Sequence, residues 1–215
     1  MAKTDFLTIR NASILVSMFK NSKITIGVPH HTPGGTEEMP CSEHKYGDEN
    51  TGYIGQYISE KMGASFVCAC NYFLDPNKAL NTDYAVAIIK SNPTYLIEIH
   101  GHDKRRTDND IEISCGNRQR ETYAIKLKQQ IESIISEWSS EDPKWSLLNK
   151  IKIGANFEYI YFKATGSATI QDMDWIPLHI ELSYILRRNA ETNQLSNEGI
   201  LFQDVLCEAI KRVCK

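Results

Sequence analysis

Two pairs of histidines follow short apolar segments in this chain of 215 residues. One segment runs into His30 and His31, and another runs into His100 and His102. A metal-binding imidazole needs such a fixed position at the end of a strand. A single segment of this kind would most simply be a polar loop. Two of them, at equivalent ends of two strands, favour a metal site.

Acidic side chains that could complete such a site lie at residues 47–52, shortly after the first histidine pair. Asp48 and Glu49 precede an amphipathic stretch, where acidic residues commonly cap or begin a helix. A role in helix capping would by itself account for the presence of Asp48 or of Glu49. It does not explain why the segment follows His30 so closely, with the Gly34-Gly35 pair between them.

Two glutamates interrupt apolar segments. Glu181 and Glu98 each lie in a segment that otherwise has the pattern of a buried strand. A buried carboxylate must be paired, neutral or functional, because burying an unpaired charge is costly. For Glu181, pairing with Arg187 or Arg188 is the simple alternative. Glu98 could contact a histidine or lie at a sheet edge.

The pattern of apolar residues predicts an α/β fold. Short β-branched segments are typical of buried strands, and longer amphipathic segments of helices. The predicted strands cover residues 13–19, 24–28, 65–70, 94–99, 157–162 and 178–183, and the predicted helices cover 53–62, 79–91, 120–138 and 198–213. Their alternation predicts a mixed or parallel sheet covered by helices. In such sheets functional residues collect beyond the carboxyl ends of the strands, where both histidine pairs are expected.

Composition excludes several classes of protein. The chain is 41% hydrophobic and 24% charged, with a formal net charge of −3, which argues against a disordered chain and against nucleic acid as a partner. No apolar run approaches the roughly 20 residues that span a bilayer, and no signal peptide is evident. We therefore expect one cytoplasmic domain over residues 1–215, with no membrane partner and with its six cysteines as structural thiols. The sequence indicates no oligomeric state.

Short motifs between about residues 24 and 188 occur in an order that points to a known family. They are Gly27-Val-Pro-His30, the acidic residue and helix of 47–64, Asp75-Pro-Asn77-Lys78, Leu96-Ile-Glu-Ile-His100-Gly-His102, and the segment from His179 through Glu181 to Arg187. In order and spacing they resemble the N-formylglutamate amidohydrolase family, which is related in fold to zinc carboxypeptidases and aspartoacylases. The resemblance implies a zinc-peptidase-like, three-layer α/β/α fold with a central mixed, largely parallel sheet.

The resemblance also implies a metal centre and a reaction. His30, Asp48 and His100 would bind Zn²⁺, or another divalent transition metal such as iron, cobalt or manganese. Three protein ligands leave one position for water, as in catalytic zinc sites. Glu181 would be the catalytic carboxylate. The implied activity is hydrolysis of an amide bond in a small anionic N-acyl amino acid by metal-activated water. His31 and Glu49 stay open as alternatives to the adjacent ligands.

The sequence departs from the family where the substrate would bind. The family's Asp-x-Asn-Arg motif ends in an arginine, and the corresponding residue here is Lys78. Asn71 stands where the family has another arginine, before this motif. An ammonium group does not replace a bidentate guanidinium without loss. Candidate substrate contacts are Asn77, Lys78, His102, Arg105 and Arg106, and Arg118 and Arg120 are further cations.

Two alternative interpretations therefore stay open. The same fold could act on peptide or poly-γ-glutamate substrates, or it could be an inactive metal-binding or partner-binding module. We expect His44 and His179 to be structural, and the sequence leaves open whether loop 32–46 closes over the site.

Overall fold

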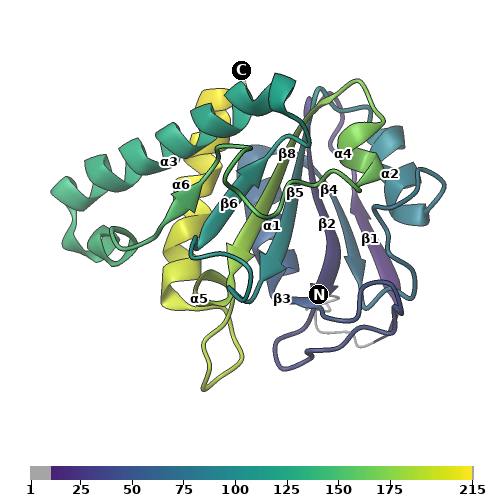
Figure 1. Ribbon diagram of the computed structural model, residues 1–215, viewed down its shortest axis with the longest axis horizontal. Helices are drawn as coiled ribbons and strands as arrows, with labels where there is room; N and C mark the ends of the chain where they lie inside the picture. The colour runs from purple at the N-terminus through teal and green to yellow at the C-terminus, as the bar shows by residue number, and fades with distance from the viewer. Residues whose placement is uncertain (1–10, 215) are drawn as a thin grey trace.

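An eight-stranded sheet forms the centre of residues 11–214, which are the residues that the computed structural model describes (Figure 1). Its order is β1-β4-β2-β5-β8-β6-β7, with β3 paired to β2. The strands are β1 (Ser13–Ser17), β2 (Ile24–Thr32), β3 (Asp48–Glu49), β4 (Ser65–Cys70), β5 (Tyr95–His102), β6 (Ile111–Ser114), β7 (Ile153–Gly154) and β8 (Ile176–Ser183).

The central strands are parallel, and antiparallel strands lie toward the edges. Strands β4, β2, β5 and β8 pair in parallel, so their carboxyl ends meet at one edge of the sheet. Strand β1 is antiparallel to β4, and β6 is antiparallel to β8. The prediction of a mixed, largely parallel sheet is confirmed.

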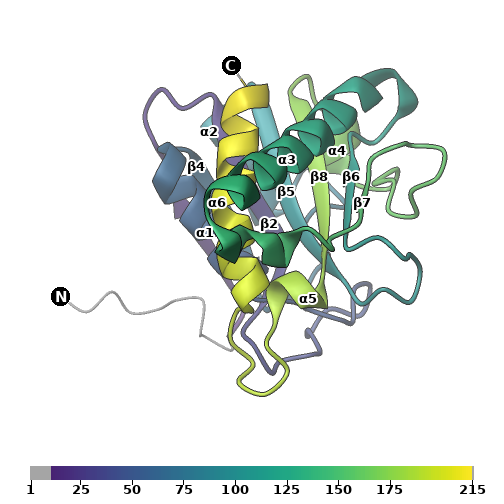
Figure 2. The same cartoon turned by 90° about the vertical axis from the view of Figure 1, so that its left-hand side faces the viewer.

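Helices cover both faces of the sheet. They are α1 (Thr51–Met62), α2 (Asp83–Ser91), α3 (Glu121–Glu141), α4 (Ala168–Gln171), α5 (Tyr184–Arg187) and α6 (Asn197–Val213), with 3-10 helices η2 (Arg118–Arg120) and η3 (Pro143–Leu148). Figure 1 places α3 and α6 to one side of the strands and α2 and α4 to the other, and Figure 2 looks onto α3 and α6. The three-layer arrangement is confirmed. No helix in this part of the chain is both long and apolar enough to cross a bilayer.

Side-chain alternation along the strands produces two hydrophobic cores. Ile97 of β5 faces the larger core with α1, α3 and α6, whereas its neighbour Leu96 faces the smaller core with α2 and α4. The helix boundaries follow local signals. Gly63 ends α1 with φ 62°, a left-handed conformation that glycine adopts without steric cost, and the Thr82 hydroxyl accepts a hydrogen bond from the backbone N–H of Ala85 to begin α2.

Phe202 of α6 is fully buried in the larger core, so we expect Phe202→Ala to lower the free energy of unfolding by about 3–5 kcal/mol. Urea denaturation of the two proteins measures this difference. Ile200 lies on the same helix but is 52% exposed, so Ile200→Ala is the matched control and should cost much less. Equal losses in both variants would contradict the assignment of this core.

The prediction of a strand at residues 157–162 is wrong. The segment forms turns, and the backbone N–H groups of Tyr161 and Phe162 donate to the carboxylate of Glu112 on β6. A side chain thus satisfies backbone groups that a neighbouring strand would otherwise bind. The short strands β3, β6 and β7 were not predicted. Strands β2 and β5 also run farther than predicted, so both histidine pairs lie within the last residues of strands and not in loops.

Candidate metal centre

Two histidines and an aspartate converge at the carboxyl edge of the sheet. His30 lies in β2, His100 in the neighbouring strand β5, and Asp48 in the short strand β3 beside β2. Asp48 Oδ2 lies 3.5 Å from His30 Nδ1 and 3.8 Å from His100 Nδ1. All three residues are buried, and their ligand atoms lie within 4.8 Å of one another.

The opposite nitrogen of each imidazole contacts a second carboxylate. His30 Nε2 lies 2.9 Å from Asp75 Oδ1, and His100 Nε2 lies 3.3 Å from Glu98 Oε2. Carboxylates in this position commonly orient metal-binding histidines and fix the tautomer of the ring. Both rings are thereby oriented with Nδ1 toward Asp48.

The donor set fits a divalent metal ion. His30 Nδ1 and Asp48 Oδ2 are buried, face each other at 3.5 Å, and have no other hydrogen-bond partner in the described part of the chain. Such atoms are rare in folded proteins unless something else satisfies them. Two imidazole nitrogens and one carboxylate oxygen are a usual ligand set for zinc, and other transition metals accept the same set.

The alternative ligands are held elsewhere. His31 Nδ1 accepts a hydrogen bond from the backbone N–H of Gly52 at 3.1 Å. The carboxylate of Glu49 accepts hydrogen bonds from the backbone N–H of Gly35 at 2.6 Å and from Arg188 Nη1 at 2.8 Å. The geometry therefore favours His30 and Asp48 over their neighbours.

Glu181 lies on β8 directly beside His100 on β5. Its side chain is buried, Oε1 lies 3.4 Å from His179 Nε2, and Oε2 has no hydrogen-bond partner among the residues that the structure describes. Among residues 11–214 it is not paired with an arginine, because Arg188 binds Glu49 and Arg187 donates to main-chain carbonyls. Burial, followed by the nearby charge of Asp48, raises the pKa of Glu181 well above its usual value.

The candidate ligands strongly perturb each other's protonation. Burial by itself lowers the pKa of His30, but the carboxylates of Asp48 and Asp75 outweigh burial and raise it to about 9. Burial by itself raises the pKa of Asp48, but the adjacent His30 outweighs it and the pKa falls below its usual value. His30 therefore holds a proton tightly, and a metal ion would have to displace that proton to bind the ring.

Two further histidines, which we expected to be structural, lie in the walls of the site. The ring of His44 stacks on His30, with centroids 3.7 Å apart, and the ring of His179 lies 4.3 Å from His100. Burial and the neighbouring charge of His30 lower the pKa of His44 to about 4. Burial and His100 lower the pKa of His179 well below its usual value. His179 is two residues before Glu181 on the same strand, so strand alternation could have placed it here.

Two cavities meet around these side chains. The larger has a volume of about 520 Å³ and is lined by His102, Arg105 and Arg106, together with Asp48. The smaller has a volume of about 270 Å³ and is lined by Asn77 and Lys78, together with the ligand histidines and Glu181. His44, Tyr161 and Phe162 line both.

All five candidate substrate contacts thus lie on a cavity wall. Loop 32–46 also reaches the site through His44 and Tyr46. Arg118 and Arg120 do not line either cavity. Arg118 pairs with Glu158, and Arg120 donates to the carbonyl of Ile170.

Several solved structures have a fold similar to that of this chain. No family model and no curated protein sequence matches the chain. A bacteriophage poly-γ-glutamate hydrolase is similar with a TM-score of 0.59 and 14% identity, over 94% of this chain and 88% of that one. The N-formylglutamate amidohydrolase of Ralstonia eutropha JMP134 is similar with a TM-score of 0.57 and 10% identity, over 94% and 97%. The chain shares the N-formylglutamate amidohydrolase fold. The resemblance inferred from the motifs is confirmed at this level.

A third solved structure has a similar fold. A gene product of Agrobacterium tumefaciens is similar with a TM-score of 0.54 and 13% identity, over 96% of this chain and 98% of that one. The three similarities extend over nearly the whole length of each chain, so they concern the complete fold and not a part of it. At these identities they describe architecture and not activity.

Roles for Asp75 and Glu98 were not assigned from the sequence. Asp75 stood out only as part of a motif, and a histidine contact was one of the alternatives for Glu98. Glu98 also accepts hydrogen bonds from Tyr84 at 3.0 Å and Thr169 at 2.7 Å. These contacts and that with His100 outweigh burial, so the pKa of Glu98 is lowered and the carboxylate stays charged beside the ring.

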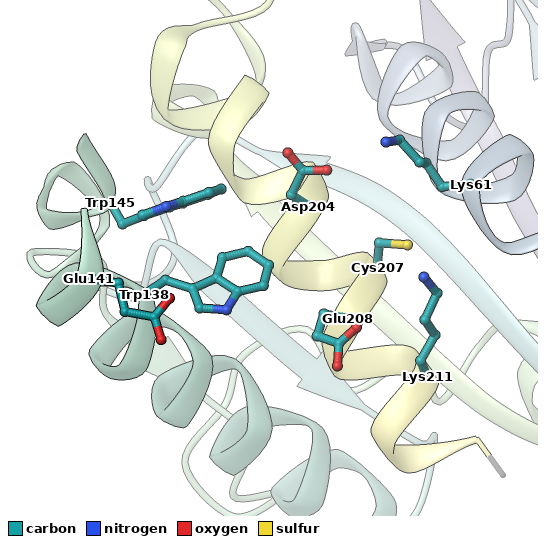
Figure 3. Close-up of a pocket in the computed structure, with 8 residues that line it drawn as sticks. All are labelled: Lys61, Trp138, Glu141, Trp145, Asp204, Cys207, Glu208 and Lys211. Atoms are coloured by element: carbon teal, nitrogen blue, oxygen red, sulfur yellow. The ribbon is translucent and has the colours of Figure 1, made fainter. Parts of the chain in front are cut away.

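Another hollow lies away from these residues, between α1, α3, η3 and α6 (Figure 3). Its volume is about 390 Å³. It is lined by Lys61, Trp138, Glu141, Trp145, Asp204, Cys207, Glu208 and Lys211. It shares no lining residue with the cavities around the candidate metal centre, so it provides positions for control substitutions.

Proposed function

We propose that this protein is a metal-dependent amidohydrolase that binds Zn²⁺ through His30, Asp48 and His100. One observation carries the proposal: the Nδ1 atoms of both histidines face the same buried oxygen of Asp48, while Asp75 and Glu98 hold the opposite nitrogens. This arrangement has the ligands of a metal site and the carboxylates that orient them.

Glu181 is the proposed general base. A bound divalent metal ion would polarise the scissile carbonyl and lower the pKa of nearby acids, including a water molecule and Glu181. Glu181 has a buried oxygen that no described residue hydrogen-bonds, and it lines a cavity with both histidines. In its ionised form it would accept a proton from the attacking water and deliver it to the departing nitrogen.

The proposed substrate is a small anionic N-acyl amino acid of the N-formylglutamate type. The supporting observation is the surplus of cations on the cavity walls. Arg105 and Arg106 line the larger cavity with His102, and Lys78 lines the smaller cavity with Asn77. Cationic and amide side chains of this kind bind carboxylates.

A longer anionic substrate is the second candidate. Cations lie on both sides of the candidate metal centre, with Lys78 and Lys163 on the smaller cavity and Arg105 and Arg106 on the larger. The phage poly-γ-glutamate hydrolase has a similar fold. Comparing the hydrolysis of N-formylglutamate, acylated amino acids, peptides and γ-glutamyl oligomers separates the two candidates, because only the second predicts faster turnover of the oligomers.

Metal content tests the proposed ligands. We expect about one zinc per chain in the wild type after loading, and loss of it in His30→Ala and in His100→Ala, because each removes one of three ligands. Mass spectrometry of metals in the purified proteins measures this. His31→Asn is the matched control, since its amide oxygen can still accept the Gly52 N–H, and it should retain zinc. Full zinc occupancy in either alanine variant would reject that residue as a ligand.

A further inference from the structure

A buried arginine lines the larger cavity, and the charges of Asp48, Glu181 and Glu49 act on it from beyond ion-pair distance. Arg187 is 6% exposed and forms no ion pair with a carboxylate among residues 11–214. Its guanidinium donates to three main-chain carbonyls, those of Leu182 at 2.9 Å, Glu49 at 3.1 Å and His102 at 3.2 Å. A guanidinium has five N–H donors, so two stay available. An arginine buried in this way normally has an anionic partner.

The backbone is shaped to hold this guanidinium. A Cβ atom at Gly101 would lie 2.3 Å from Arg187 Cζ, so only glycine lets the planar group lie against β5. The three carbonyls belong to the ends of β8, β3 and β5. Arg187 is therefore fixed beside the strand ends that carry the candidate metal ligands.

His102 adds a second donor to the same cavity. Its Nδ1 accepts a hydrogen bond from the backbone N–H of Lys104 at 3.2 Å, so in the neutral ring Nε2 carries the proton. That Nε2 atom is buried and has no hydrogen-bond partner within 3.5 Å among residues 11–214, although the backbone of Asp110 acts on the ring. Arg187 Nη2 donates to the main-chain carbonyl of His102, the guanidinium charge acts on the His102 ring, and both residues line the cavity.

We propose that the Arg187 guanidinium and the His102 Nε2–H together bind a carboxylate of the substrate. The inference rests on the proposed function and identifies where the anionic group lies, on the β5–β8 side of the metal ligands. A planar guanidinium fork with an adjacent N–H donor matches the geometry of a carboxylate. Arg105 and Arg106 lie at the wall of the same cavity, over the exposed rings of Tyr46 and Tyr161.

Binding of glutarate, glutaramate and glutaramide to the zinc-loaded protein, measured by calorimetry, tests this site. One carboxylate of glutarate can bind the metal centre, and the second carboxylate is the probe. We expect glutarate to bind about ten-fold or more tightly than glutaramate, because a charge-assisted hydrogen bond is lost with the amide. Arg187→Lys and His102→Phe should each remove most of this difference, since each loses donors and nearly preserves volume.

Arg188→Lys is the matched control, because Arg188 is adjacent in the chain but binds Glu49 and does not line the cavity. It should keep the preference for glutarate. Equal binding of glutarate and glutaramate by the wild type, or an unchanged preference in Arg187→Lys and His102→Phe, would overturn the proposal. If Arg187→Lys does not fold, His102→Phe and the wild-type comparison decide.

Zinc content is measured in the same samples, which separates the two proposals. A wild type that takes up no zinc contradicts the proposed function. Binding of glutarate, glutaramate and glutaramide is then compared on the metal-free protein. A glutarate preference that persists there and disappears in His102→Phe supports the carboxylate site alone. Retained zinc without a glutarate preference contradicts only the carboxylate site. Inorganic phosphate is titrated in parallel, and tighter binding of phosphate than of glutarate would overturn the assignment of a carboxylate.

Discussion

Glu181→Gln is expected to fold, to keep its metal and to hydrolyse the best amide substrate about a hundred- to ten-thousand-fold more slowly than the wild type. Glutamine has nearly the same volume and can occupy the buried position between His100 and β6. It cannot accept the proton of the attacking water. The measurement is kcat at matched zinc content, with circular dichroism and thermal unfolding to compare the folds.

Glu141→Gln is the control for this substitution, because Glu141 lines the hollow between α1, α3, η3 and α6 and not the candidate site (Figure 3). It should turn over at the wild-type rate. Retained activity in Glu181→Gln would reject the assigned role of Glu181. A wild type that binds zinc but hydrolyses none of the tested amides would favour the alternative of an inactive metal-binding module.

The sequence predicts the fold well where the signals are local. Short β-branched segments correctly located β1, β2, β4, β5 and β8, and amphipathic stretches located α1, α3 and α6. Parallel strands bring their carboxyl ends to one edge, so residues that follow different strands in the sequence become neighbours. For this reason the strand pattern alone is enough to group His30 with His100.

Long-range contacts of side chains explain what the sequence did not predict. Residues 157–162 have the apolar and aromatic pattern of a strand, but the carboxylate of Glu112 binds two of their backbone N–H groups. Arg187 was considered as a partner of Glu181, yet it binds carbonyls from three separate strands. His44 reaches His30 only because loop 32–46 folds back on itself through backbone hydrogen bonds such as that from Met39 N–H to the carbonyl of Lys45. No local pattern encodes these contacts.

Metal affinity is expected to rise steeply with pH up to about pH 9. The pKa of His30 is raised to about 9, because Asp48 and Asp75 stabilise the protonated ring more than burial destabilises it. A metal ion binds the neutral imidazole, so below this pKa one proton must leave for each ion bound. Apparent affinity should therefore increase about ten-fold per pH unit between about pH 6 and 9, and then level off. Competition with a chelator of known affinity at each pH measures the slope.

Asp75→Asn separates this proton competition from other effects of pH. The amide can keep a contact with His30 Nε2 but removes a negative charge 2.9 Å from the ring, so the pKa of His30 should fall. The affinity should then level off at a lower pH than in the wild type. Because the carboxylate also orients the ring and increases its basicity, the limiting affinity at high pH should be about 10- to 100-fold weaker. A levelling point that does not move would show that Asp75 does not control the proton that the metal displaces, whereas a flat wild-type profile would remove His30 from the ligand set.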